Sequence, residues 1–390
     1  MTQEVTITRL AHGGDGIGEI DGKICFVPYG LPGDTLEVKL TKDKKTFCRG
    51  RITKVVTPSP DRIKVDCRVY EKCGGCSWFH LDYPAQLEWK QKIVETAFLK
   101  LAKLDVTVDG LENPDLRTGY RTRATFKGHE GDWGFYAAES HEVVDIDECP
   151  LCHPDMNAAL KKLKQTPIGG EVEVLVNPEG DEVFLWTEEP SKELKNDFPS
   201  AQNLEDGDGR VQFMFDEIPV VNGTFNQSSL QLNRLLVDHV HSFLQDAESI
   251  LDLYCGSGNM TLGLSEKAHI VGLDKNGPAI RVADHTGRGE FHIGSDKAFP
   301  DFINRQKWGA IILDPPRVGA KHSMPALRDA DTDRIIYISC DPATLARDAA
   351  VILQGPWKIN SITAIDIFPN TNHIETVCVF DRKTNEEQEL

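Results

Sequence analysis

The sequence lacks any apolar run of the roughly 18–20 residues that a membrane-spanning helix needs. Its first residues, MTQEVTITRL, contain neither the basic segment nor the apolar segment of a signal peptide. We therefore expect a soluble, cytoplasmic and monomeric protein. Internal repeats and low-complexity segments are also absent, which argues against repeat architectures. A chain of 390 residues is expected to form two or three domains.

Positive charge is scarce, because 43 Lys and Arg face 61 Asp and Glu, a net charge of −18. This deficit is unusual for a nucleic-acid enzyme, since phosphate binding draws on Lys and Arg. Local patches matter more than the sum, and residues 39–54 form one. Asp43 is the one acid in that segment, and its basic residues are Lys39, Lys42, Lys44, Lys45, Arg49, Arg51 and Lys54. The run predicts either a phosphate-binding surface or a solvated strand face.

The ten cysteines are not accompanied by an export signal, which argues against a disulfide scaffold. Cys67, Cys73 and Cys76 are bunched around the glycines of KCGGC, and thiols this close indicate a metal site. A fourth ligand must come from a distance, and Cys149 and Cys152 are both candidates. Four soft thiolates suit either zinc or a [4Fe–4S] cluster. The C-x5-C-x2-C spacing does not fit a zinc ribbon, although the spacing of the second group would.

The pattern of expected elements divides the chain into three parts. Residues 1–57 contain short β-rich runs separated by turn signals such as HGGDGIG and GLPGD, which favours a small barrel of the OB type. Residues 58–222 mix helices with alternating strands and predict a central α+β domain with the cysteine cluster. Residues 223–390 alternate buried strands with helices, which predicts a doubly wound, Rossmann-like parallel sheet. The expected fold class is therefore multidomain α/β.

A glycine turn lies near the start of the third part. DLYCGSGNMTL follows a buried strand and opens a helix, so Gly256 and Gly258 let a ligand approach the backbone at the carboxyl edge of the sheet. Asp274 ends the next strand and can accept hydrogen bonds from both ribose hydroxyls. LDPPR ends the third strand and brings Asp314 to the same edge. The G-S-G-N spacing weakens an NAD site, but NAD, S-adenosylmethionine and a turn without a ligand all stay open here.

Cys340 ends the fourth expected strand, in IIYISCDPATLARD, just before a helix. An isolated cysteine is usually a small core residue, but its place at the ligand-binding edge favours a nucleophile. The helix N-terminus is expected to favour its thiolate. Glu375, in TNHIETVCVF, lies near the start of the last strand. Its apolar neighbours would raise its pKa and suit it to accept a proton, unless the alternation of the strand turns it to solvent.

Such a pair of side chains suits methylation of carbon 5 of a uracil ring. C5 is too weak a nucleophile to take a methyl group from a sulfonium directly. A thiolate that adds to C6 produces an enolate whose C5 can attack the methyl group. A base must then remove the C5 proton before the thiolate leaves. Cys340 and Glu375 fit these two roles.

The order of the motifs resembles that of the RNA 5-methyluridine methyltransferases, namely FNQ (225–227), DLYCGSGN, LDPPR, SCDPATLARD and HIET. GDGIGEIDGKICFVPYGLPGD resembles a TRAM domain, and the cysteine loop resembles that of members with an iron–sulfur cluster. The resemblance spans nearly the whole chain. It implies an RNA (uracil-C5-)-methyltransferase that uses S-adenosylmethionine and carries a [4Fe–4S] cluster. Its implied partner is structured RNA, with 23S ribosomal RNA first and a tRNA T-loop second.

The resemblance also implies roles for individual residues. Cys340 would be the nucleophile and Glu375 the proton acceptor. The cofactor contacts, with the glycine of the turn included, would be Gln227, Tyr254, Gly256, Asn259, Asp274, Asp296 and Asp314. The cluster ligands would be Cys67, Cys73, Cys76 and Cys149. Asp341 and Ser229 depart from the family, which usually has Asn at both positions, and a carboxylate beside Cys340 would raise the pKa of its thiol.

Two other functional classes stay open. A cytosine-C5 methyltransferase shares the thiolate chemistry, and a protein methyltransferase could share the sheet. A non-catalytic RNA-binding iron–sulfur protein is the third hypothesis, and the intact Cys340 and Glu375 argue against it.

Overall fold

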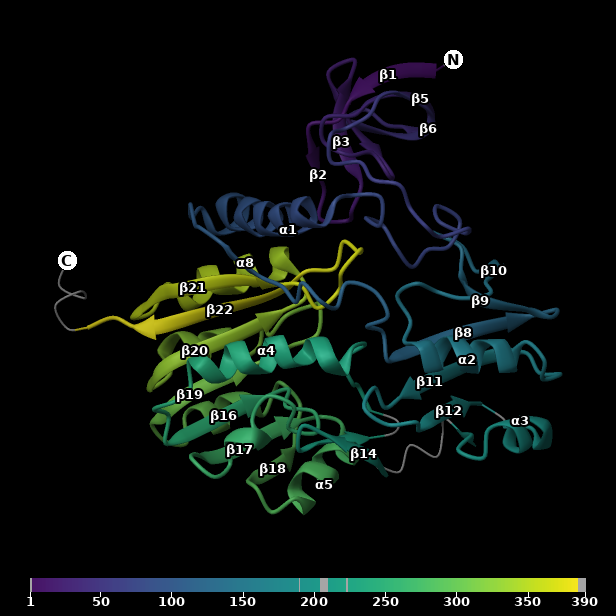
Figure 1. Ribbon diagram of the computed structural model, residues 1–390. Helices are drawn as coiled ribbons and strands as arrows, with labels where there is room; N and C mark the ends of the chain where they lie inside the picture. Colours follow the sequence, from purple (N-terminus) through teal and green to yellow (C-terminus); the bar gives the residue numbers. More distant parts are fainter. Residues whose placement is uncertain (1, 189, 204–209, 222–223, 385–390) are drawn as a thin grey trace.

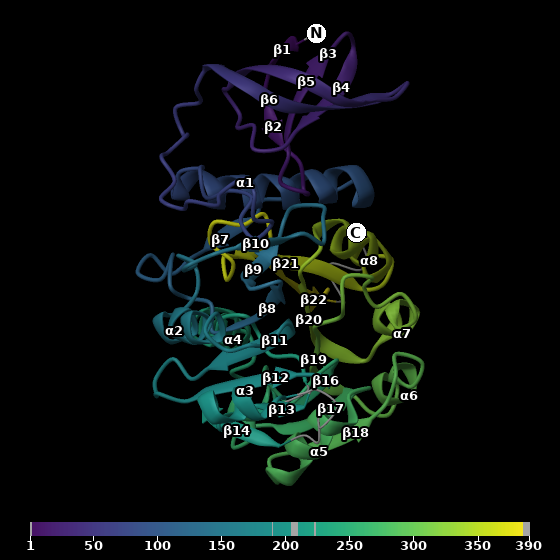
Figure 2. The same cartoon turned by 90° about the vertical axis from the view of Figure 1, so that its right-hand side faces the viewer.

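The computed structural model describes residues 2–188, 190–203, 210–221 and 224–384 (Figure 1). A small β-unit at the N-terminus sits above a large α/β unit, and a second α+β unit lies beside the large one. In the two views, helix α1 (Tyr83–Ala97) lies between the N-terminal unit and the large sheet (Figures 1 and 2).

The N-terminal unit is a six-stranded sheet with the order β1-β5-β6-β4-β3-β2. Its strands are β1 (Thr2–Thr6), β2 (Arg9–Leu10), β3 (Gly16–Ile20), β4 (Lys23–Val27), β5 (Thr35–Asp43) and β6 (Phe47–Thr57). The motif HGGDGIG predicted a turn, but its last three residues belong to β3. A Cβ atom at Gly16 or Gly18 would lie 2.5 Å from the carbonyl oxygen of Gly30 or Thr6. These glycines therefore allow close backbone approach inside a strand.

The central unit is a second six-stranded sheet, ordered β10-β9-β8-β11-β12-β13, with α2 (Pro154–Leu163) and α3 (Lys192–Asp197). Its strands are β8 (Arg123–His129), β9 (Asp132–Tyr136), β10 (Val143–Asp145), β11 (Gly170–Val176), β12 (Val183–Thr187) and β13 (Gln202–Asn203). The antiparallel pairing of β8 to β12 confirms the strands and the hairpin predicted there. A separate hairpin, β14 (Val211–Phe215) and β15 (Ile218–Val221), leads towards the large unit.

The large unit is an eight-stranded sheet ordered β18-β17-β16-β19-β20-β22-β21-β7. Its strands are β7 (Asp109–Leu111), β16 (Ser249–Leu253), β17 (His269–Asp274), β18 (Glu290–Ile293), β19 (Trp308–Leu313), β20 (Thr332–Ser339), β21 (Trp357–Ile365) and β22 (Glu375–Arg382). The five strands from β18 to β20 are parallel, as predicted. β22 is antiparallel to β20 and β21, because a short segment rather than a crossover helix joins β21 to β22.

Helices cover both faces of this sheet, so the doubly wound prediction is confirmed. Side chains that alternate along the strands separate into two cores, with Leu251 and Ile311 in one and Ile250 and Ile312 in the other. The first core includes α1, the π-helix η1 (Phe98–Ala102), α6 (Phe299–Ile303), α7 (Met324–Asp329) and α8 (Pro342–Ile352). The second includes α4 (Leu230–Ser242), the 3-10 turn η3 (Leu262–Leu264) and α5 (Gly277–His285).

The central part of the chain also contributes to the large sheet. α1 packs against α8 and β21, and β7 pairs in parallel with β21. Residues 83–111, placed by the sequence pattern in the central domain 58–222, therefore belong to the core of the large unit. Their apolar periodicity indicated a buried helix face but carried no information on which sheet would cover it. The predicted boundary at 222/223 falls outside the described residues.

The described helices include none that is long and apolar enough to cross a membrane.

Candidate functional site

The candidate site lies at the carboxyl edge of the parallel strands. The register pairs Leu253 with Leu273 and Leu313, and Leu313 with Tyr337. The residues that follow these strands, including Asp274, Asp314 and Cys340, therefore emerge at the same edge. The structure thus brings together the glycine turn, the two acids and the cysteine that the sequence singled out.

The glycine turn is fixed by its backbone and by Asp274. Tyr254, Gly256 and Gly258 all have positive φ angles, of 63°, 56° and 88°. Asp274 accepts hydrogen bonds from the backbone N–H of Gly256 at 3.1 Å and of Asn276 at 2.7 Å. A Cβ atom at Gly256 would meet nothing within 4 Å, so open space adjoins the backbone there. This turn opens the short 3-10 segment η3 rather than the predicted helix.

Tyr254 and Asp296 lie at one side of the turn. The Tyr254 ring is half-buried and packs edge-on against Phe299, with ring centroids 4.8 Å apart. Burial, and after it the carboxylate of Asp296, raises the pKa of the Tyr254 phenol. Asp296 is partly exposed, and its carboxylate is 3.9 Å from His322 Nε2. The phenol and the carboxylate thus interact electrostatically, and their role as cofactor contacts stays a prediction.

Asn259, a residue of the turn, is hydrogen-bonded to α4, and Gln227 lies just before that helix. The amide groups of Asn259 and Asn233 exchange hydrogen bonds of 2.8 and 3.1 Å. This pair ties the start of α4 to the turn, and Gln227 is buried three residues before that helix. The amide of Asn259 is therefore engaged by the protein itself. Phe225, by contrast, is 73 % exposed beside this segment.

The buried acid Asp252 of β16 was not predicted. It accepts a hydrogen bond of 2.7 Å from the Thr261 hydroxyl, and burial raises its pKa to about 7. Burial and the neighbouring Asp274 raise the pKa of Asp314 to about 7 as well. An acid inside the otherwise apolar strand SILDL is the signal that could have identified Asp252. After burial, the carboxyl groups of Asp314 and Asp274 also raise the pKa of Asp252, so the three acids interact.

Cys340 and Glu375 lie on adjacent strands. The antiparallel register of β20 and β22 ends with Ser339 opposite Thr376, so Cys340 comes next to Glu375 at the end of the ladder. Glu375 is 4 % exposed, which means that the alternation of the strand directs it into the protein and not to solvent. Cys340 is only partly buried. The geometry places a reachable thiol beside a buried carboxyl group.

The electrostatic environment of Cys340 corrects one expectation from the sequence. Burial first, and then the carboxyl groups of Glu375 and Asp314, raise the pKa of its thiol to about 11, against the lowering effect of Arg317. The free thiol is therefore not activated by its position at the start of α8 alone. Burial, and then Asp314, also raises the pKa of Glu375 well above its usual range.

Both departures from the family pattern cap helices. Asp341 accepts a hydrogen bond of 2.8 Å from the backbone N–H of Thr344 at the start of α8. The Ser229 hydroxyl accepts one of 3.1 Å from Leu232 at the start of α4. Ser, Asp and Asn are all good N-cap residues, so either substitution preserves the local structure. The carboxylates that dominate at the thiol are Glu375 and Asp314 rather than Asp341.

The raised thiol pKa makes a testable prediction. In the free protein, alkylation of Cys340 by iodoacetamide should accelerate about tenfold per pH unit from pH 7 towards 11, because the thiolate is the reacting form. Mass spectrometry of the Cys340 peptide measures the rate. Arg317→Met should slow alkylation, and Asp341→Asn should hardly change it. A rate that is already maximal at pH 8 would contradict the raised pKa.

The cysteine loop forms a second candidate site. Cys67, Cys73, Cys76 and Cys149 line one pocket, whereas Cys152 is buried in the core of the central unit. Arg121 lines the same pocket, and its buried Nε–H has no acceptor in the described part of the chain. Among the described residues, no three Cys, His, Asp or Glu side chains are arranged to hold a metal ion. All ten cysteines are free.

Two segments of the chain match known protein families. Residues 1–53 match the TRAM domain, and residues 301–383 match the family described as tRNA (Uracil-5-)-methyltransferase. The first match covers most of the N-terminal unit. The second runs from α6 to the end of β22 and so contains Asp314, Cys340 and Glu375.

Similar proteins align with almost the whole chain. The 23S rRNA (uracil(1939)-C(5))-methyltransferase RlmD of Methylococcus capsulatus is 31 % identical over 96 % of both chains. The enzyme of the same name from Vibrio parahaemolyticus is 28 % identical over 97 % of this chain and 96 % of its own. Among solved structures, the Pyrococcus abyssi tRNA (uracil-54, C5)-methyltransferase in complex with S-adenosyl-L-homocysteine has a TM-score of 0.76 and 26 % identity. That alignment covers 96 % of this chain and 99 % of the other.

Proposed function

Because this chain belongs to the family of S-adenosylmethionine-dependent RNA uracil-C5 methyltransferases, we propose that its substrate is a uridine of 23S ribosomal RNA. The observation that carries the proposal is the end-to-end similarity to relatives named for that RNA, at 31 % identity over 96 % of both chains. A uridine of a tRNA is the second candidate, since the similar solved structure is named for uracil 54 of tRNA.

The residues at the sheet edge support binding of S-adenosylmethionine, which supplies the methyl group. The open backbone at Gly256 leaves room for the ligand, and the neighbouring Asp274 and Asp296 offer acceptors for its hydroxyl and amino groups. Asp274 keeps lone pairs free beyond its two backbone hydrogen bonds. Tyr254 and Gln227 complete the surroundings that we assign to the cofactor.

Cys340 and Glu375 carry the chemistry in this proposal. The Cys340 thiolate forms a bond from Sγ to C6 of the uracil, and the ring becomes an enolate that is nucleophilic at C5. Once C5 carries the methyl group, Glu375 accepts the C5 proton, the bond from Sγ to C6 breaks and the thiolate is restored. Arg317 lowers the pKa of the thiol and so assists its ionisation.

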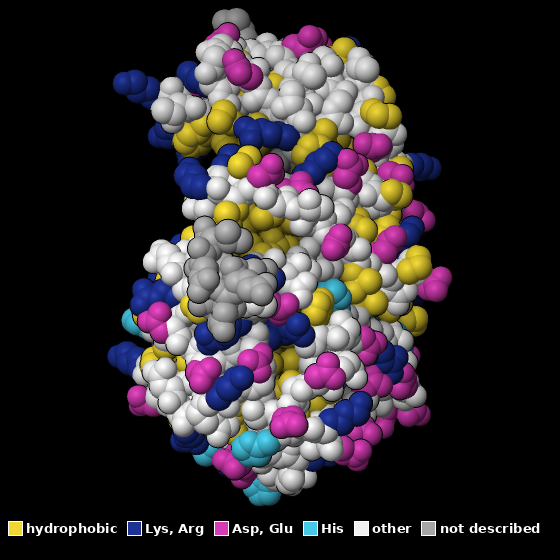
Figure 3. Space-filling model, turned by 90° about the vertical axis from the view of Figure 1, so that its left-hand side faces the viewer, with side chains coloured by type: hydrophobic (Ala, Val, Ile, Leu, Met, Phe, Trp, Pro, Cys, Tyr) yellow, Lys and Arg dark blue, Asp and Glu magenta, His cyan; other side chains and the backbone are white. Residues whose placement is uncertain are grey.

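The N-terminal unit supports the RNA-binding part of the proposal. Six basic residues on β5, β6 and the turn between them are exposed, namely Lys39, Lys42, Lys44, Lys45, Arg51 and Lys54. Arg49 is paired with Asp15 and Glu139 instead. Figure 3 shows Lys and Arg side chains around the unit at the top and gathered Asp and Glu side chains lower down. Positive side chains that project from two strands can neutralise the phosphates of an RNA backbone.

The RNA assignment is tested by mapping 5-methyluridine in the total RNA of a strain that lacks this gene. We expect one 23S position to lose the modification, and purified protein should restore it on a 23S transcript. Loss at a T-loop uridine with intact 23S rRNA would select the tRNA candidate. Product on cytosine would contradict uridine as the target.

We also propose that the four cysteines that line one pocket, Cys67, Cys73, Cys76 and Cys149, hold a [4Fe–4S] cluster with a structural role. Four thiolates are a complete ligand set for such a cluster, and its sulfur atoms would accept the unpaired N–H of Arg121. Cys152 lies outside this pocket, which supports Cys149 as the fourth ligand.

Anaerobic purification tests the cluster and its fourth ligand together. We expect brown protein with about four iron atoms per chain, as in a cubane cluster held by four cysteines. Cys149→Ser should lose most of the iron, whereas Cys152→Ser, the matched control, should keep it. Equal retention in the two variants would contradict the ligand assignment. Colourless protein with stoichiometric zinc would contradict the cluster itself.

A further inference from the structure

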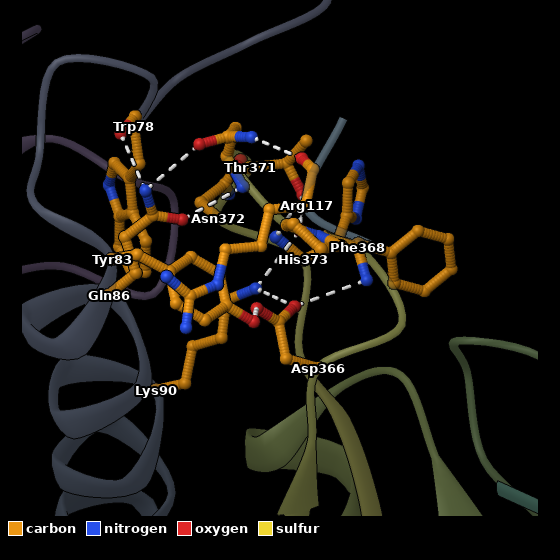
Figure 4. A network of polar contacts seen from close by, with 12 residues as sticks. Trp78, Tyr83, Gln86, Lys90, Arg117, Asp366, Phe368, Thr371, Asn372 and His373 are labelled. Carbon is orange, nitrogen blue, oxygen red and sulfur yellow. Dashed lines mark hydrogen bonds and ion pairs between the residues drawn. The ribbon is translucent and has the colours of Figure 1, made fainter. Parts of the chain in front are cut away.

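The segment 366–373, called here the strap, connects β21 to β22 and ends just before Glu375. Its sequence, DIFPNTNH, is mostly polar, yet Asp366, Asn370 and Thr371 are buried. The strap has no helix or strand of its own, so its polar groups are satisfied by bonds within the strap and by side chains from other parts of the chain. Figure 4 shows these side chains converging on it from α1 and the segment before α1.

The first anchor is a buried ion pair. Lys90 of α1 is fully buried, and its Nζ lies 2.6 Å from Asp366 Oδ1 and 3.1 Å from the carbonyl oxygen of Phe368. The Tyr83 hydroxyl donates to the other oxygen of Asp366 at 2.7 Å. A buried charge pair is costly to break, because the remaining charge has no solvent. The first residues of the strap are therefore held against α1.

The second anchor holds the tight turn at Asn370, whose φ angle of 67° is left-handed. Gln86 of α1 accepts a hydrogen bond from the Asn370 backbone N–H at 2.8 Å and donates one to its side-chain oxygen at 3.1 Å. The Asn370 side chain also donates to the carbonyl of Arg117 at 2.8 Å. One glutamine thus fixes both the backbone and the side chain of the turn.

The third anchor comes from the cysteine loop. Ser77, the residue after Cys76, donates to Asn372 Oδ1 at 2.9 Å and accepts from the Asn372 backbone N–H at 2.8 Å. Asn372 also donates to the carbonyl oxygen of His12 in the N-terminal unit at 3.2 Å. Units far apart in sequence therefore meet at a residue that is three positions before Glu375.

Glu375 depends on this arrangement because it is the first residue of β22. The ladder with β21 begins at Glu375, and the ladder with β20 ends at Thr376. Strand pairing fixes the chain after Glu375, whereas the strap fixes the direction from which the chain enters. A shift of the strap would move the carboxylate relative to Cys340.

We infer that Ser77, Gln86 and Lys90 are positioning residues that hold the strap so that Glu375 can remove the C5 proton. The inference rests on the proposed role of Glu375 as the base. It follows that the cysteine loop and the N-terminal unit, which we assign to structure and RNA binding, also determine the geometry of the last chemical step. Loosening an anchor slows proton removal more than it slows bond formation by Cys340.

The test separates the two steps by rapid quench with a radiolabelled methyl donor. We expect Ser77→Ala to release S-adenosylhomocysteine in the first turnover within about twofold of the unmodified protein. Its denaturant-resistant protein–RNA adduct should persist about tenfold longer. This is less than the rate enhancement of about 10²–10⁴-fold that a positioned base contributes, because the base is displaced and not removed. Lys90→Met should also leave S-adenosylhomocysteine release nearly unchanged and should prolong the adduct even more than Ser77→Ala does. A melting curve establishes that this variant folds. Lys92→Met, on the exposed face of α1, and Ser242→Ala, at the end of α4, are the matched controls.

The outcomes distinguish the inference from its premise. If Glu375→Gln accumulates the adduct but Ser77→Ala clears it at the normal rate, the positioning role is wrong and the base assignment stands. If Ser77→Ala slows both steps equally, its contact with Asn372 serves general stability, which also overturns the inference. If Glu375→Gln itself leaves no adduct, the base assignment fails and the inference with it.

Discussion

Cys340→Ala is expected to abolish methyl transfer, with a loss of at least about 10⁴-fold in turnover, because the proposed mechanism activates C5 of the uracil through the Cys340 thiolate. RNA affinity should change by less than about threefold, since the side chain is small and contributes little contact area. A filter-binding assay and a tritium-release assay on the same RNA measure the two quantities. Binding with no product would identify Cys340 as chemically essential rather than as a binding residue.

The matched control for this variant is Cys378→Ala. Cys378 lies on β22, three residues after Glu375, and is fully buried in the core. Loss of its sulfur leaves a small cavity but no chemical defect, so activity should survive with a lower melting temperature. If Cys340→Ala retained a tenth of the activity, a covalent mechanism through this residue would be untenable.

Glu375→Gln is expected to form the methylated covalent adduct and then fail to resolve it. Burial favours the neutral carboxylic acid form of Glu375. Glutamine has nearly the same shape and is also uncharged, so the fold should be preserved. Turnover should fall by about 10²–10⁴-fold, the usual contribution of a positioned base. The observable result is an RNA–protein band that survives denaturation and contains the transferred methyl group.

The pH dependence of adduct decay tests whether Glu375 accepts the C5 proton. The raised pKa of Glu375 means that its carboxyl group is protonated at low pH and cannot accept a proton. Decay in the unmodified protein should therefore accelerate as the pH rises, until the carboxylate predominates. The Gln variant has no group to titrate, and its slow decay should be flat over the same range. A parallel slope in both proteins would assign the titration to another group.

Several features of the site follow from local pattern. Buried strands that alternate with helices predict a parallel sheet, and the carboxyl ends of parallel strands share an edge. For this reason Asp274, Asp314 and Cys340 were expected to converge, and the strand register brings them together. The order of the motifs was sufficient to indicate the family. The glycines of the turn were also informative, because positive φ angles favour glycine.

Other features could not be predicted because they depend on burial and on partners distant in sequence. Lys90 and Asp366 are separated by 276 positions, and Ser77 and Asn372 by 295, so no local periodicity reveals either pair. The same holds for α1 and β7, whose large-sheet partners lie more than 200 residues later.

The sequence by itself determined which side chains stand at the sheet edge, and with them the chemistry available to this protein. Only the tertiary structure determined the pKa values of those side chains. Burial beside Glu375 and Asp314 raises the thiol pKa of Cys340, whereas the helix N-terminus alone suggested the opposite. The pKa of a group depends on solvent exclusion and on charges from every neighbouring strand. A sequence motif gives only the residues along one strand. The charges that shift the pKa of Cys340 come from other strands, which packing places beside it.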